Sequence, residues 1–142
     1  MSANWYKCLK FLEAKSTWTK SQAYCTNDGT YDVDQLIKIT DGRADKKVEL
    51  SELEHFLSEN VWGFDEKLTP TMVLKDKNKY KEYYEDILKA NLGKPILIRE
   101  SNGEIIDGYH RLTRAFIEKR DYIKAIYVSD EEMKEAKIED LI

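Results

Sequence analysis

Cysteine, proline and glycine are all scarce in this chain. Its 142 residues include two cysteines, two prolines and six glycines. Cys8 and Cys25 have no CxxC spacing and no neighbouring histidine, so the sequence indicates neither a zinc site nor a disulfide framework, and we expect two partly buried free thiols. Because no repeat, linker or low-complexity stretch interrupts the chain, we expect a single domain over residues 1–142.

The chain also lacks an excess of positive charge and any long apolar run. Lys and Arg number 23 against 27 Asp and Glu, for a formal net charge of −4. This balance excludes a broad basic surface for a nucleic-acid backbone. No apolar run reaches the ~20 residues of a membrane-spanning helix, and the first residues lack the apolar core of a secretory signal. We therefore expect a cytoplasmic protein with no membrane partner.

The apolar spacing predicts an α+β fold, with a small mixed sheet and flanking helices. Helices are predicted over residues 5–15, around 36–39 after a cap at Asp32 or Asp34, over 51–57 with a Ser51 and Glu54 capping box, over 70–88 from Thr69-Pro70, over about 109–119, and from Asp130. Strands are predicted over residues 48–50, 95–98, 104–106 and 122–129. Residues 16–30 are polar and predict an exposed connection.

One segment carries chemistry, the run Asp107-Gly108-Tyr109-His110-Arg111 between a predicted strand and a predicted helix. The start of a helix leaves backbone N–H groups unpaired and carries partial positive charge, so an anion fits there. Gly108 has no Cβ and allows an anion to approach the backbone. Further along the helix Arg114 joins His110 and Arg111 on one side, and a bound anion would relieve the repulsion among them.

Residues 105–115 resemble the signature of the ParB/sulfiredoxin-like superfamily, in which a Pro-Ile strand and a hairpin precede a Gly-x-His-Arg helix start. Pro95-Ile96 stands where that strand is expected. The resemblance covers residues 94–128 best and leaves residues 1–45 as an N-terminal extension. It implies a ParB/sulfiredoxin-like fold that holds the phosphates of ATP, ADP or CTP at Gly108, Tyr109, His110 and Arg111.

Departures from the family narrow the function that the resemblance implies. The reductases place a catalytic cysteine directly before the His-Arg pair, where this chain has Tyr109. A phenol of pKa near ~10 does not replace a thiolate, so we do not expect a sulfinic acid reductase. Partition proteins continue into a helix-turn-helix domain, for which the 142 residues leave no room after the motif. We therefore do not expect sequence-specific DNA binding.

Two classes of function remain open. The first is a nucleotide- or phosphate-binding domain, either without catalysis or as a magnesium-dependent kinase or nucleotide hydrolase of a small substrate. Its candidate catalytic residues are Asp107, His110 and Arg114. Either Asp107 or a glutamate of residues 49–59 would handle the metal or the proton, and no metal ligand is assigned. The alternative is a non-catalytic protein-interaction module with this fold. Each candidate also has a structural interpretation: Asp107 as a helix cap, His110 as a hydrogen-bonded histidine, and Arg114 in an i, i+4 pair with Glu118.

Overall fold

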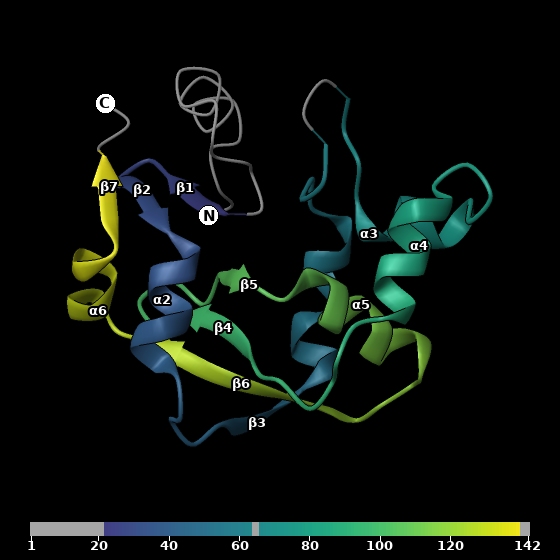
Figure 1. Ribbon diagram of the computed structural model, residues 1–142. Helices are drawn as coiled ribbons and strands as arrows, with labels where there is room; N and C mark the ends of the chain where they lie inside the picture. The colour runs from purple at the N-terminus through teal and green to yellow at the C-terminus, as the bar shows by residue number, and fades with distance from the viewer. Residues whose placement is uncertain (1–21, 64–65, 140–142) are drawn as a thin grey trace. The chain divides into compact units, whose positions relative to one another are not determined.

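The computed structural model describes residues 22–63 and 66–139 and has a small mixed α+β fold with two sheets (Figure 1). The predicted fold class is confirmed, whereas the ParB/sulfiredoxin-like assignment and the single domain stay predictions. By its contacts the chain divides into two compact units. The first takes its described residues from Met1–Arg43, Leu97–Asp107 and Tyr127–Ile142, and the second takes them from Ala44–Ile96 and Gly108–Ile126. The helix predicted over residues 5–15 lies outside the described residues.

The first unit contains a three-stranded antiparallel sheet in the order β1-β2-β7. Its strands are β1 (Ala23–Thr26), β2 (Gly29–Asp32) and β7 (Lys137–Glu139). The exposed connection predicted over residues 16–30 is therefore wrong for its second half. Tyrosine and threonine favour strands despite their polar atoms, and every residue of β1 is buried.

Cys25 on β1 also departs from the prediction of a free thiol. Its side chain is buried and disulfide-bonded. The other cysteine of the chain, Cys8, lies outside the described residues. Disulfides are rare in the reducing cytosol. The disulfide at Cys25 therefore does not support the predicted cytoplasmic location. Separately, none of the helices among the described residues has the length and apolar character needed to cross a membrane.

Two helices of the first unit have side-chain caps. Asp32 caps α2 (Val33–Thr40) by accepting from the backbone N–H of Gln35, as one of the two predicted alternatives. Ser129 and Glu132 form a capping box at the start of α6 (Asp130–Glu135), and this helix contacts α2. The acidic segment predicted as a helix from Asp130 is thus short, since β7 follows it and pairs with β2.

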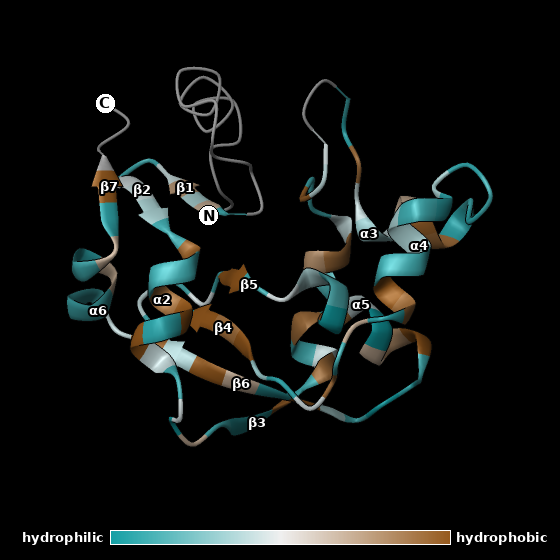
Figure 2. Ribbon diagram, in the orientation of Figure 1, coloured by the Kyte–Doolittle hydropathy of each residue, from teal (hydrophilic) through white to brown (hydrophobic). Residues whose placement is uncertain are grey.

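A four-stranded sheet has the order β3-β6-β4-β5. The strands β4 (Ile96–Arg99) and β5 (Ile105–Asp107) form the predicted antiparallel hairpin, with Leu97 opposite Asp107 and Ile98 opposite Ile105. Figure 2 shows the hydrophobic residues that run along both strands. The predicted strand near residues 122–129 is also confirmed, as β6 (Tyr122–Val128).

In the second unit, β3 (Lys46–Glu49) pairs with the first part of β6 and leads into a 3₁₀ helix, η1 (Leu50–Ser58). The predicted capping box at Ser51 is wrong, because the helix begins at Leu50 after Glu49 without a side-chain cap. Leu50, Leu53 and Phe56 are all buried. Their spacing of three residues matches the three residues per turn of a 3₁₀ helix.

The helix predicted over residues 70–88 is two helices, α3 (Pro70–Lys75) and α4 (Lys81–Leu88). Its predicted start is confirmed, because Thr69 caps α3 and Pro70 occupies the first turn. The break follows from Asp76, whose Oδ1 accepts from the N–H of Lys79 and forms a local turn.

Candidate functional site

Helix α5 (Tyr109–Ile117) begins at Tyr109, where the sequence predicts it, with Gly108 as its N-cap. The N-cap supplies no side-chain hydrogen bond, and the first turn contains no acidic residue. Among the described helices, α2, α3 and α6 have side-chain caps, and α4 and η1 have an acid in the first turn. A bound anion at α5 would supply the acceptor and the negative charge that the other helix starts obtain from their own side chains.

Gly108 is required by both the backbone and the packing of this helix start. Its φ of +114° lies in the region that favours glycine. A Cβ there would lie 2.4 Å from Cγ2 and 2.8 Å from Cβ of Ile96, and 3.2 Å from a terminal guanidinium nitrogen of Arg111. The guanidinium of Arg111 therefore lies directly beside the N-cap of its own helix.

The position of Arg111 has an electrostatic consequence. Its Nε is buried, and one of its terminal nitrogens lies beside the helix start. The N-terminal end of a helix carries partial positive charge, and a cation beside it is unfavourable. An anion between the two would be attracted to both. Arg111 and Gly108, two of the residues predicted to hold phosphates, thus lie side by side at the start of α5.

Aromatic rings surround the first turn of α5. The imidazole of His110 stacks on the indole of Trp62, with ring centroids 4.8 Å apart and an interplanar angle of 27°. Trp62 in turn lies 5.7 Å from the ring of Tyr83 on α4. Tyr109 contacts Phe56 of η1 edge-on at 6.4 Å. Both side chains that precede Arg111 are thus anchored by packing.

Trp62 is a site residue that sequence reasoning missed. It lies in an irregular segment after η1, where no periodicity marks its direction. The available signal was its residue type alone, since an indole that is only half-buried offers a flat surface for another ring. Only the tertiary structure shows that this surface is next to His110.

Arg114, a candidate catalytic residue, forms hydrogen bonds with other residues of the second unit. Its Nη1 donates to the backbone oxygens of Leu88 at 2.8 Å and Ala90 at 2.6 Å, at the end of α4. Its Nε donates to Glu118 at 2.7 Å, which is the i, i+4 pair of the structural alternative. Arg114 therefore joins α5 to the end of α4, where carbonyl groups otherwise lack partners.

Replacing Arg114 by alanine should lower the free energy of unfolding by about 1–2 kcal/mol, because two carbonyl oxygens lose a charged donor at a partly exposed site. Arg120→Ala is the matched control. Arg120 pairs with the same Glu118 but its side chain is 53% exposed, and its loss should cost less than about 0.5 kcal/mol. Urea unfolding followed by circular dichroism measures both. Equal losses would contradict the role of Arg114 at the end of α4.

Asp107, the remaining candidate catalytic residue, is the last residue of β5 and is half-buried. Gly108, and not Asp107, occupies the N-cap position of α5. Asp107 belongs to the first unit, whereas the other candidates belong to the second. Over residues 22–63 and 66–139, no three His, Cys, Asp or Glu side chains gather as metal ligands. A magnesium ion in a nucleotide site is usually held by one or two carboxylates together with phosphate oxygens and water, so the magnesium dependence that the resemblance implies stays a prediction.

The first unit contains a buried polar cluster that the sequence did not indicate. The hydroxyl of Tyr24 donates to the carboxylate of Glu104, and Asn102 Nδ2 donates to the same oxygen at 3.0 Å. Burial and the Glu104 carboxylate raise the pKa of Tyr24 above its usual range. The sequence predicted only a hairpin turn at residues 101–103, and this cluster joins that turn to β1.

Arg99 is the central cation of the first unit. It is 8% exposed, and its guanidinium lies 6.0 Å from the ring centroid of Tyr24 and 5.4 Å from that of Tyr31. It binds both carboxylate oxygens of Asp28, at 2.6 and 3.4 Å. The hydrogen bonds from Arg99 lower the pKa of Asp28 to about 2. The two terminal nitrogens of Arg99 thus bind Asp28, whereas its buried Nε has no hydrogen-bond partner among the described residues and lies 3.8 Å from a carboxylate oxygen of Asp130.

Comparison of the chain with family models, with curated proteins and with solved structures gives no match. The resemblance to the ParB/sulfiredoxin-like superfamily thus remains a prediction from the residues around Gly108 and Arg111.

Proposed function

We propose that the second unit binds a phosphate-bearing small molecule, most simply a nucleotide, at the start of α5. One observation carries this proposal: the Arg111 guanidinium lies against a positive-φ glycine N-cap that has no side-chain cap. Phosphate oxygens would accept from Arg111 and from backbone N–H groups of the first turn. ATP, ADP and CTP share the phosphate chain that such a site recognises.

The neighbouring aromatic residues support a nucleotide as the ligand. Trp62 and His110 present stacked rings beside the proposed phosphate position, and aromatic side chains bind nucleobases by stacking. The proposed function is binding without a catalytic step. Arg114, a candidate catalytic residue, already donates to Glu118 and to backbone oxygens at the end of α4, so the proposal is confined to binding.

Calorimetric titration of ATP, ADP and CTP, each with and without magnesium, tests the proposal. Loss of a charge-assisted contact is worth roughly 1.5–3 kcal/mol, so Arg111→Gln should weaken affinity by about 10- to 100-fold. Arg43→Gln, an exposed arginine of the other unit, should leave affinity unchanged. Circular dichroism confirms that each variant is folded.

Two results would contradict the proposal. One is nucleotide binding that Arg111→Gln leaves intact in a folded protein. The other is the absence of binding by any of the three nucleotides, which is what the alternative of a non-catalytic protein-interaction module predicts.

A further inference from the structure

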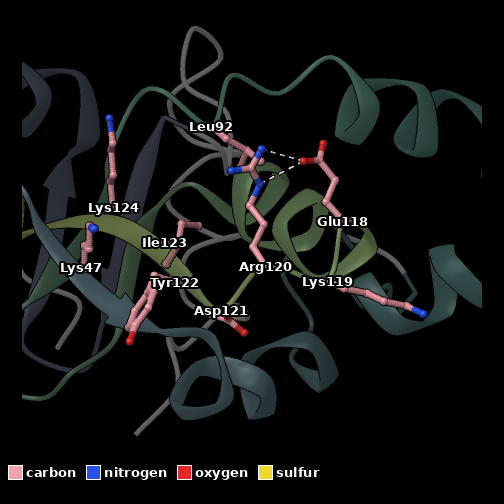
Figure 3. Close-up of a pocket in the computed structure, with 9 residues that line it drawn as sticks. All are labelled: Lys47, Leu92, Glu118, Lys119, Arg120, Asp121, Tyr122, Ile123 and Lys124. Atoms are coloured by element: carbon pink, nitrogen blue, oxygen red, sulfur yellow. Dashed lines mark hydrogen bonds and ion pairs between the residues drawn. The ribbon is translucent and has the colours of Figure 1, made fainter.

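A concave surface of the second unit lies along β6 and the residues that precede it (Figure 3). It is a cavity of about 480 Å³, and its lining includes Leu92, Lys47, Tyr122 and Lys124. No residue of the α5 start lines it. Its volume is typical of sites for small organic molecules and exceeds what an inorganic phosphate needs.

Two lysines of this cavity are direct cross-strand neighbours. Lys47 on β3 is opposite Lys124 on β6 in the antiparallel register. Like charges directly opposite each other destabilise a strand pair. The chain as a whole has a formal net charge of −4, so a general excess of lysine does not explain the pair.

Protection of a sheet edge explains the lysine on β3 but not the lysine on β6. β3 is an edge strand, and lysines on edge strands prevent pairing with other chains. Lys124 is on β6, which lies between β3 and β4 and therefore has no open edge to protect. Glu49, opposite Tyr122 on the same face, supplies one negative charge beside Lys47. A ligand of negative charge would balance the second lysine.

The rest of the lining places an aromatic ring, that of Tyr122, beside the two lysines. Tyr122 is 50% exposed, and Lys47 Nζ lies 6.0 Å from its ring centroid. Arg120 pairs with Glu118, and Figure 3 shows Lys119 pointing away from Lys47 and Lys124. Asp121 also lines the cavity, and Figure 3 shows its carboxylate pointing away from Lys47 and Lys124. The two opposed lysines and the tyrosine are the groups that we assign to a ligand.

We propose that this cavity binds an organic phosphate, with the phosphate between Lys47 and Lys124 and an attached ring against Tyr122. The site is independent of the one at α5. It uses different residues, and the loss of either site leaves the other intact.

Calorimetric titration with phenyl phosphate tests the proposal, with phenol and inorganic pyrophosphate as probes of the ring alone and of the charge alone. Lys124→Glu should weaken phenyl phosphate binding at least about tenfold, because an attractive charge becomes repulsive. Lys46→Glu is the matched control: it makes the same charge reversal on the same strand, opposite Ala125 on the other face. It should change the affinity less than about twofold.

Arg111→Gln distinguishes the two sites. This variant should bind phenyl phosphate in the β6 cavity as the wild type does, whereas Lys124→Glu should not. The unliganded protein gives a further readout. Lys124→Gln should raise the melting temperature by about 1–2 °C, because it removes the like-charge pair. Phenyl phosphate should stabilise the wild type and not this variant. Equal affinity of Lys124→Glu and Lys46→Glu, or no binding to the wild type, would overturn the proposal.

Discussion

Replacing Gly108 by alanine should lower the free energy of unfolding by about 2–5 kcal/mol, the largest effect we expect. Two costs add. A non-glycine residue at positive φ is strained by about 1–2 kcal/mol, and forcing a methyl group into a packed core costs about 1–3 kcal/mol. The added Cβ would lie 2.4 Å from Ile96 Cγ2. Chemical denaturation measures the change.

Gly103→Ala is the control for this prediction. Gly103 has a φ of +72°, but an added Cβ would have nothing within 4 Å. Only the backbone cost of about 1–2 kcal/mol should remain. If both substitutions cost the same, Ile96 does not restrict the start of α5, and the described geometry around Gly108 is wrong.

Arg99→Ala should lower the free energy of unfolding by about 2–4 kcal/mol. Removing one partner of a buried ion pair costs up to about 3–5 kcal/mol, but Asp28 retains 55% side-chain exposure and can be hydrated. The substitution also removes the cation that lies over the rings of Tyr24 and Tyr31. Urea unfolding of the variant and the wild type at neutral pH measures the difference.

Arg43→Ala is the control in the same unit. Arg43 also pairs with a carboxylate, that of Glu132, but its side chain is 38% exposed, so its loss should cost less than about 1 kcal/mol. Acid gives a second test. The pKa of Asp28 falls from 3.8 to about 2 in the folded protein, so its ion pair stabilises the fold above pH 3.8 and loses this contribution as the pH falls through 2. The difference between Arg99→Ala and the wild type should narrow over that range, and a constant difference would contradict the ion pair.

Local chemistry made part of the fold predictable. The turn at residues 101–103 and the β-branched residues around it predict the β4–β5 hairpin, and Gly108 predicts the start of α5 one residue later. A cap acts within three residues of its own position, so the sequence predicted the start at Thr69 and named Asp32 as one of two caps for α2. The same reasoning failed at Ser51, because η1 begins one residue earlier.

Contacts between distant residues could not be predicted from such patterns. Arg99 and Asp28 are 71 positions apart, and nothing near Asp28 marks it as the partner of a buried cation. The polar sequence of β1 concealed a buried strand, since Tyr24 is buried with its hydroxyl bound to Glu104. The stack of His110 on Trp62 likewise depends on tertiary packing. Sequence therefore located the helix start, and the structure supplied the side chains around it.

The most direct test of the phosphate site is the ¹H–¹⁵N spectrum of the full chain during a titration with ADP. If phosphates bind at the start of α5, the backbone amides of Tyr109, His110 and Arg111 should shift most and should saturate together, at the affinity that calorimetry gives. In Arg111→Gln the same amides should shift only at about 10- to 100-fold higher ADP. Amides of residues 109–111 that stay unchanged at saturating ADP would contradict the proposed function.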